Sequence, residues 1–326
     1  MARVITDFSG DTPDAMAVTM DLERFSDEDS EQVIFYGINS VLNHSLQEVY
    51  KDYKRKILVD LWSPCQFNAL LQPGNVDAHQ MVEYFDEVHS ICPYTVKWMN
   101  KVNSYEKMRH IKSPFNKKLV PEEREKEYDV CYTGSIHSQE FFDLVNAISE
   151  FNYRFISKGV TSADFAANKV TDLRVSTEEK MDIVAKSKIG VAINLLYLTP
   201  EHVNHFLSYP RMDENEMYEG VLEGSRSGEH WTRAPQFKIR IHEYAVSKTL
   251  ILCKRDQWNV IEEYYVPGED FIYFDDMQDL KEKISEVLSD YNKYKPIINS
   301  AYEKVHEHYM TETVIQDILS GGVECR

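Results

Sequence analysis

The chain has 326 residues, of which 43% are hydrophobic, and it carries a formal net charge of −18 at pH 7. The hydrophobic content excludes an intrinsically disordered protein, and the length predicts one large domain or two of ordinary size. The negative charge argues against binding of a polyanion by the whole surface. No apolar stretch approaches the ~20 residues of a membrane-spanning helix, and the N-terminus lacks the apolar core of a secretory signal. The five cysteines show no C-x-x-C spacing, so we expect no zinc site, no disulfide framework and a cytoplasmic location.

The first 120 residues alternate between apolar runs and helical patterns. This alternation predicts a parallel sheet with helices on both faces. The runs predicted to be strands cover residues 3–6, 33–36, 57–61 and 88–91. Ligands of such sheets bind outside the carboxyl ends of the strands, and Asp60 lies near the end of the third run. Asp60 is therefore our candidate general base, although an Asp that caps the following helix or turn is an equally good interpretation.

A charged, proline-containing segment at residues 113–125 divides the chain. It predicts an N-terminal domain at residues 1–120 and a C-terminal domain at residues 121–326. Residues 97–118 carry seven basic side chains and a single acidic one. Such a basic strip in an acidic protein would suit an anionic acceptor, contacted by Lys107, Arg109 and Lys112. A solvated surface is the commoner explanation for a run of this kind.

After the division, strands are again predicted to alternate with helices. The strands cover residues 128–132, 153–156 and 189–195, and the helices residues 141–151 and 181–184. The first strand ends at Gly134-Ser135, where a glycine lets the backbone approach a phosphate and Ser135 can donate to it; a plain turn is the alternative. Asn194, near the end of another strand, is expected to border the nucleotide. The long charged segment 210–236 is expected to be a mobile flap near the same site.

Arg240 and Glu243 lie three residues apart at the start of a predicted helix, which precedes the predicted buried strand Leu250-Ile251-Leu252. The first amides of a helix are unpaired and attract anions, and an Arg there can clamp a diphosphate with its fork of donors. A carboxylate one turn later can accept hydrogen bonds from two ribose hydroxyls. The pair therefore suits a nucleoside diphosphate that bears a sugar. Taken alone, an Arg–Glu pair on the surface of an ordinary helix is the commoner outcome.

The element order after this helix resembles the C-terminal half of group-1-type glycosyltransferases of the GT-B fold. Their pattern runs R-x-F-E, small residues, a strand, a helix, G-x-D/E, a strand, an Asp and a long helix that ends near a His. Here Val266-Pro267-Gly268-Glu269-Asp270 forms the turn, and His242 replaces the usual aromatic residue before the Glu. The resemblance covers residues 125–310. It implies two Rossmann-like domains that face each other across a cleft, and the last helix is expected to cross back to the first domain.

A closer similarity is to the DNA β-glucosyltransferases of T-even phages. It rests on Asp60-Leu61-Trp62-Ser63-Pro64, Thr133-Gly134-Ser135 and Ile239-Arg240-Ile241-His242-Glu243, which occur in the same order at similar spacing. The resemblance implies that Asp60 is the base of an inverting transfer, while Arg240 and Glu243 hold the diphosphate and the ribose of the donor. That family has two Arg residues soon after its Gly-Ser, whereas this chain offers only His137 there. We expect Lys238, Arg233 or Arg226 to compensate.

These patterns together predict a glycosyltransferase that uses a nucleoside diphosphate sugar, taken to be a UDP-sugar, as its donor. No D-x-D motif has the context of a metal site, so no obligatory metal or other cofactor is expected. The basic strip and the phage similarity favour a hydroxymethylated base in DNA as the acceptor. A glycan or protein acceptor, a sugar-nucleotide epimerase of the same fold and a non-catalytic nucleotide-sugar binding module remain open.

Overall fold

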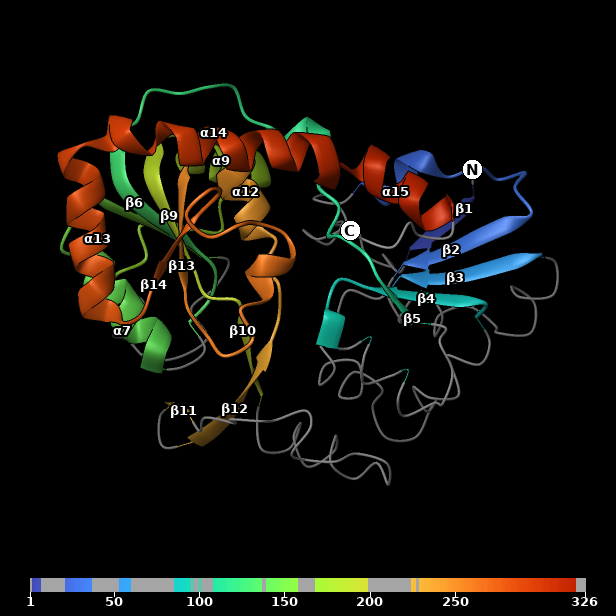
Figure 1. The fold of residues 1–326 in the computed structure, drawn as a ribbon, viewed down its shortest axis with the longest axis horizontal. Helices are drawn as coiled ribbons and strands as arrows, with labels where there is room; N and C mark the ends of the chain where they lie inside the picture. Colours follow the sequence, from blue (N-terminus) through green and yellow to red (C-terminus); the bar gives the residue numbers. More distant parts are fainter. Residues whose placement is uncertain are drawn as a thin grey trace.

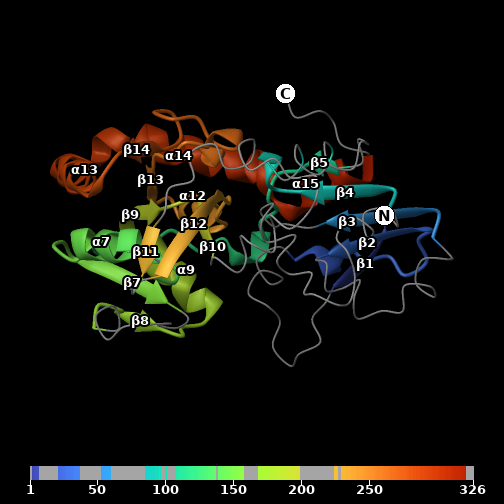
Figure 2. The same ribbon diagram turned by 90° about the horizontal axis from the view of Figure 1, so that it is seen from below.

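The computed structural model describes residues 2–6, 21–36, 53–59, 85–94, 96, 100, 108–136, 139–157, 168–198, 224–226 and 229–320. Within these ranges the protein is α/β, with two parallel sheets that lie side by side (Figure 1) and remain separate when the molecule is turned (Figure 2). This architecture confirms the fold class that the alternation of strands and helices predicted.

The first sheet contains five parallel strands that follow one another in chain order. The strands are β1 (Arg3–Thr6), β2 (Gln32–Tyr36), β3 (Arg55–Val59), β4 (Glu87–Ser90) and β5 (Met108–His110). The apolar runs of β2 and β3 are fully buried between neighbouring strands, which is why the sequence revealed them. Strand β5 was not predicted, because its three residues contain no apolar run.

The second sheet contains six parallel strands in the order β14-β13-β9-β6-β7-β8. The strands are β6 (Tyr128–Thr133), β7 (Tyr153–Ser157), β8 (Asp172–Leu173), β9 (Ser187–Ala192), β13 (Leu250–Lys254) and β14 (Ile272–Phe274). The chain runs outward from β6 to one edge of the sheet, then returns to β9 and continues to the other edge. This reversal creates a topological switch point between β6 and β9, where ligands of doubly wound sheets bind.

Helices cover both faces of the second sheet because alternate strand residues are apolar on each side. Val130 and Tyr132 pack in one hydrophobic cluster with α7 (Gln139–Ile148) and α13 (Met277–Ser289). Cys131 packs in the other cluster with α9 (Thr177–Ala185), α12 (Arg240–Val246) and α14 (Lys295–Lys304). Two short 3₁₀ helices, η3 (Val260–Glu263) and η4 (Tyr291–Tyr294), complete this region. Helix α12 is thereby fixed with its first turn at the carboxyl edge of the sheet.

A small antiparallel sheet corrects two expectations. Strands β10 (Leu195–Leu198) and β11 (Gly224–Arg226) pair with β12 (Glu229–Pro235), so the end of the expected flap is sheet rather than loop. The strand predicted at 189–195 is likewise two strands, β9 and β10, interrupted at residues 193–194. Charges and glycines concealed the β11–β12 hairpin, although the intervening dipeptide Ser227-Gly228 is a turn signal. Residues 199–223 lie outside the described ranges.

Two segments connect the sheets and run next to each other. In the first, Phe115 accepts a hydrogen bond from the Thr311 amide at 3.0 Å, and its own amide donates to the Tyr309 carbonyl at 2.8 Å. In the second, a π-helical turn at Val305–Tyr309 leads into α15 (Thr311–Ser320), which packs on the first sheet (Figure 1). The 3₁₀ helix η1 (Leu22–Phe25) contacts α15, and a second one, η2 (Lys117–Leu119), follows Phe115 in the chain.

Candidate functional site

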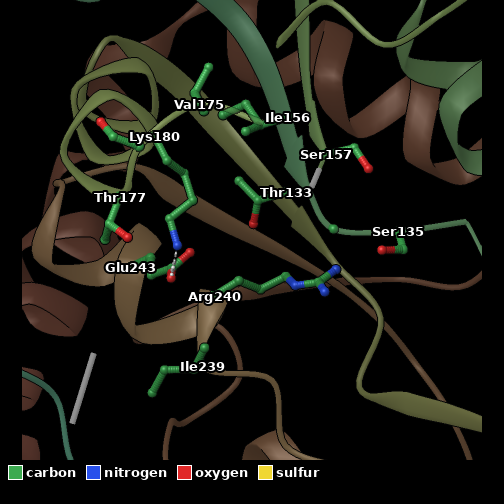
Figure 3. Close-up of a pocket in the computed structure, with 12 residues that line it drawn as sticks. Thr133, Ser135, Ile156, Ser157, Val175, Thr177, Lys180, Ile239, Arg240 and Glu243 are labelled. Atoms are coloured by element: carbon green, nitrogen blue, oxygen red, sulfur yellow. Dashed lines mark hydrogen bonds and ion pairs between the residues drawn. The ribbon is translucent and has the colours of Figure 1, made fainter. Parts of the chain in front are cut away.

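A pocket of about 250 Å³ opens at the carboxyl edge of the second sheet (Figure 3). It lies beside the switch point, because Thr133, Gly134 and Ser135 at the end of β6, one of the two strands that form that point, make up one wall. The other walls come from the end of β7, the start of α9 and the start of α12. They consist of Ile156, Ser157, Val175, Ser176, Thr177, Lys180, Ile239, Arg240 and Glu243. The pocket therefore brings together Gly134, Ser135, Arg240 and Glu243, four residues that the sequence predicted for a donor site.

Arg240 reaches the pocket with an unused hydrogen-bond donor. Its Nη1 atom is buried and has no hydrogen-bond partner. The guanidinium lies over the ring of Tyr132, with Cζ 5.1 Å from the ring centroid. An unpaired donor of this kind is costly unless a ligand supplies an acceptor, and a guanidinium pairs best with phosphate or carboxylate oxygens. The geometry is therefore that of an anion site.

Gly134 makes room for that guanidinium. A Cβ atom added at Gly134 would lie 2.6 Å from Nη2 and 2.8 Å from Nη1 of Arg240. The backbone of Gly134 also has a φ of +146°, a conformation that other residues rarely adopt. The predicted role of this glycine was close approach of the backbone to a phosphate. In the structure its first consequence is to admit the Arg240 side chain over the end of β6.

Glu243 is paired within the pocket, which the sequence did not predict. Its Oε1 atom accepts a hydrogen bond from Lys180 Nζ at 2.5 Å, and the carboxylate side chain is only 4% exposed. Lys180 comes from the first turns of α9, whose start is fixed by a capping box between Ser176 and Glu179. That Ser-x-x-Glu motif was a readable signal for the helix start. Nothing in the sequence near Lys180 signals its pairing with a residue 63 positions away.

His242, between the two site residues, faces a different environment. Its Nε2 lies 3.0 Å from the Ser113 carbonyl, which can only accept, so Nε2 carries the proton. Nδ1 is then the acceptor for the Tyr265 hydroxyl at 2.7 Å. Burial lowers the pKa of His242 to about 3, so the ring is neutral. Rings of Phe237 and Tyr309 lie 5.0 Å away, so His242 occupies the aromatic position of the family pattern inside an aromatic cluster that joins α12 to the interdomain connection.

The remaining predicted donor residues make contacts of their own. Asn194 is 1% exposed; it donates to Cys253 Sγ at 3.4 Å and accepts from the Lys238 amide at 3.0 Å. It therefore positions the segment that leads into α12. Lys238 Nζ donates to Gln236, and burial together with the nearby Arg240 lowers the pKa of Lys238 to about 7. Neither residue lines the pocket. Ser135 does, and its carbonyl accepts from the Tyr132 hydroxyl at 3.1 Å.

The predicted acceptor residues and base are described only in part. Asp60, Lys107 and His137 lie outside the described ranges. Arg109 Nε lies 3.9 Å from Glu87 Oε2. Lys112 turns toward the second sheet, where its ammonium donates to the Glu263 carbonyl and lies 5.0 Å from the Tyr264 ring centroid. These contacts occupy one donor of Lys112 and offset the charge of Arg109.

Within the described ranges, no group of three or more His, Cys, Asp or Glu side chains could hold a metal ion. No helix in the same ranges is long and apolar enough to cross a membrane.

Two parallel sheets, of which the second is doubly wound and carries a charged pocket at its carboxyl edge, have the architecture of the GT-B fold class. The chain belongs to the glycosyl transferase-like family, whose model matches residues 144–320. This result confirms the general family resemblance that the sequence suggested. No curated protein matches the chain by sequence.

Solved structures share the fold at low identity. TarM has a TM-score of 0.55 and 10% identity over 90% of this chain, which spans only 55% of TarM's own length. Sucrose-phosphate synthase from Thermosynechococcus elongatus has a TM-score of 0.55 and 11% identity, covering 89% of this chain and 72% of its own. HepE from Anabaena, solved with UDP-glucose, has a TM-score of 0.56 and 11% identity, and the match covers 89% of this chain and 78% of HepE. At these identities the likeness establishes the fold alone.

Proposed function

We propose that the chain transfers a sugar from a UDP-sugar to an acceptor hydroxyl, with the nucleotide held in the pocket beside α12. The observation that carries the proposal is the buried, unpaired Nη1 of Arg240 in the same pocket as Glu243. A diphosphate would supply the acceptors that Arg240 lacks. The choice of UDP is supported by HepE, solved with UDP-glucose, and by an S. aureus TarM mutant solved with UDP.

Each pocket residue has a chemical role in this proposal. Arg240 offsets the negative charge that grows on the diphosphate as the glycosidic bond breaks. Glu243 accepts hydrogen bonds from ribose hydroxyls, and Ser135 donates to a phosphate oxygen. Asn194 and Lys238 act on the site indirectly in this proposal, because their hydrogen bond positions the segment that leads into α12. His137 follows Ser135 in the sequence and is proposed as a further donor to the leaving group. Residues 121–326 constitute the donor-binding domain and residues 1–120 the acceptor-binding domain.

Asp60 is proposed as the base that removes the proton of the acceptor hydroxyl, with inversion at the anomeric carbon. It follows β3 directly in sequence, at the carboxyl end of that strand. Asp60→Asn keeps the shape of the side chain and removes the base, so turnover should fall by about 10²–10⁴ while UDP affinity is preserved. Steady-state kinetics and a nucleotide titration check both halves. Turnover near that of the wild type, or a product that retains the anomeric configuration, would remove Asp60 from this role.

The proposal extends to the class of molecule that accepts the sugar. Hydroxymethylated DNA is favoured by the basic strip at residues 97–118, although the Lys112 ammonium already donates a hydrogen bond to the Glu263 carbonyl. A glycan hydroxyl is supported by the TarM mutant structure, which also holds alpha-GlcNAc-glycerol, and a protein hydroxyl is the remaining alternative. Charge reversal of Lys107, Arg109 and Lys112 should abolish transfer to DNA and leave transfer to a glycan unchanged. If the triple variant retains transfer to DNA, the strip is not the DNA contact.

One experiment tests the proposed activity itself. The protein is screened with UDP-, GDP-, ADP- and dTDP-sugars by thermal shift, because a donor at 100 times its dissociation constant stabilises the fold by ~2.7 kcal/mol. Each stabilising donor is then incubated with hydroxymethylated DNA and with glycans, and products are identified by mass spectrometry. Sugar transfer that accompanies UDP release supports the proposal. An epimerised donor without transfer would indicate an epimerase, and donor binding without any product a binding module.

A further inference from the structure

The ion pair between Lys180 and Glu243 is incomplete on the side that faces the pocket. Lys180 Nζ donates to Glu243 Oε1, and no other described residue bonds to either charged group. Glu243 Oε2 is therefore left as an acceptor. An ammonium has three donors, so Lys180 also retains two. Both side chains line the pocket.

A second buried Lys–carboxylate pair shows what a purely structural pair looks like in this protein. Asp270 accepts from Ser300 Oγ at 2.6 Å through Oδ1, and from the Val266 amide at 2.7 Å and Lys304 through Oδ2. Both oxygens of that carboxylate are used, and the pair holds a turn against α14. The Lys180–Glu243 pair lacks this saturation, and it lies in a pocket rather than under a turn.

The pair is also separated from the anion site. In Figure 3 the Arg240 guanidinium extends toward Ser135, whereas Lys180 and Glu243 meet on the other side of the pocket. Apolar Ile156 and Val175 line a further wall. If Arg240 holds the diphosphate, the part of the nucleotide that reaches the pair is the sugar, with the base against the apolar wall.

We propose that Lys180 and Glu243 together read the vicinal diol of the ribose, with Lys180 as a specificity-determining residue for ribonucleotides. One hydroxyl donates to Glu243 Oε2, and the adjacent hydroxyl accepts from Lys180 Nζ. Lys180 Nζ is bonded to Oε1 of the same carboxylate, so the pair presents a donor and an acceptor side by side. This arrangement matches two neighbouring hydroxyls, one of which accepts while the other donates. This inference rests on the proposed binding of UDP, because it assigns the ribose part of that ligand.

The test compares UDP with 2′-deoxy-UDP and 3′-deoxy-UDP by calorimetric titration of the full chain. The wild type should bind UDP about ten-fold or more tightly than each deoxy analogue, since a hydrogen bond to a charged group is lost in each. Lys180→Met should bind UDP more weakly than the wild type does. For one of the two analogues, the ratio of the UDP affinity to the analogue affinity should drop below about three-fold, which is the preference that a single neutral contact can still provide. Loss of a merely structural support would weaken all three ligands equally and leave the ratios unchanged.

Two further variants keep the test decisive. Lys304→Met breaks the other buried pair, so it should lower thermal stability and leave the UDP to deoxy-UDP ratios as in the wild type. The double variant Lys180→Met/Glu243→Gln removes both charges and replaces the single variant if that one does not fold; it too should lose the discrimination.

The outcomes separate this inference from the proposed function. If no nucleoside diphosphate binds the wild type, the proposed function fails. If UDP binds but the wild type binds both deoxy analogues equally well, or if the discrimination survives in Lys180→Met, the role of Lys180 is overturned while the donor site stands.

Discussion

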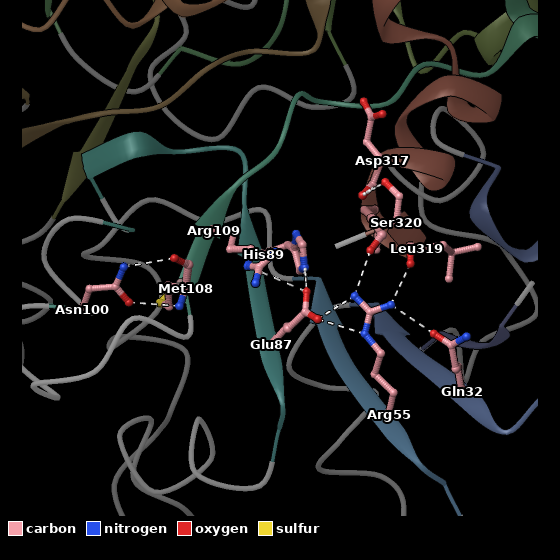
Figure 4. A network of polar contacts seen from close by, with 11 residues as sticks. Gln32, Arg55, Glu87, His89, Asn100, Met108, Arg109, Asp317, Leu319 and Ser320 are labelled. Atoms are coloured by element: carbon pink, nitrogen blue, oxygen red, sulfur yellow. Dashed lines mark hydrogen bonds and ion pairs between the residues drawn. The ribbon is translucent and has the colours of Figure 1, made fainter. Parts of the chain in front are cut away.

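Two arginines of this protein differ in whether their donors are paired, and the contrast supports the proposed site. Arg55 uses Nε, Nη1 and Nη2 to donate to Glu87, Gln32 and the carbonyls of Ile318 and Leu319 (Figure 4). Arg240 leaves a buried Nη1 without any partner. A guanidinium whose donors are all taken by the protein stabilises the fold. One that is held in place with a donor unpaired is arranged for a ligand.

Their positions in the two sheets agree with that division. Arg55 begins β3, at the amino end of the first sheet, and fastens the end of α15 to it. Arg240 lies at the carboxyl edge of the second sheet, where ligands of parallel sheets bind. Arg55 therefore stabilises the amino edge of the first sheet, and the position of Arg240 supports the proposed binding site at the carboxyl edge of the second.

Removal of Arg55 should have the largest effect on stability. Arg55→Met leaves the Glu87 carboxylate without its main partner and two carbonyls of α15 unpaired, so the free energy of unfolding should fall by about 2–4 kcal/mol. UDP affinity of the folded fraction should not change. Urea unfolding and a UDP titration measure the two quantities. A variant of normal stability with weakened UDP binding would erase the distinction between the two arginines.

Gly134→Ala probes the space that Arg240 occupies. The new methyl group would collide with the guanidinium, and the residue would be strained at a φ of +146°. UDP affinity should fall about ten-fold, equivalent to ~1.4 kcal/mol. Gly268→Ala is the matched control, because Gly268 also has a positive φ of +80° but has nothing within 4 Å of the added atom. Equal UDP affinities for the two variants would mean that the displaced guanidinium is not part of the binding site.

The buried histidines should make stability depend on pH. Burial lowers the pKa of His242 to about 3 and that of His110 to about 4, whereas an unfolded histidine titrates near 6.5. Below pH ~6.5 the unfolded chain binds protons that the folded chain does not. The free energy of unfolding therefore decreases as the pH is lowered, by up to about 1.4 kcal/mol per pH unit for each histidine. Urea unfolding between pH 7.5 and 5 measures the slope. His242→Gln should show a shallower slope; an unchanged slope would contradict the buried neutral ring.

The sequence predicted what depends on local pattern. Buried runs such as Ile57–Val59 and Leu250–Leu252 identified strands because the centre of a parallel sheet is apolar on both faces. Arg240 and Glu243 were found because both lie in one helical turn after a long polar segment. Helix α13 begins after Asp276, which caps it by accepting from the amides of Gln278 and Asp279.

What the sequence missed depends on contacts between distant segments. Lys180 is an ordinary lysine on a polar helix until the fold places it beside Glu243. The need for a glycine at position 134 is set by the Arg240 side chain, which comes from another element. Strand β11 pairs with β12, and β12 also pairs with β10, so backbone pairing forms this sheet despite the charged composition of its strands.

Calorimetric titration of UDP into the wild type and Arg240→Met measures whether the unpaired guanidinium of Arg240 binds the diphosphate. The variant should lose about 100-fold or more in UDP affinity, because charge-assisted bonds to a phosphate are lost. Its thermal stability without ligand should not fall, because the variant no longer buries an unpaired donor. Wild-type UDP affinity in a folded Arg240→Met protein would show that the diphosphate binds elsewhere.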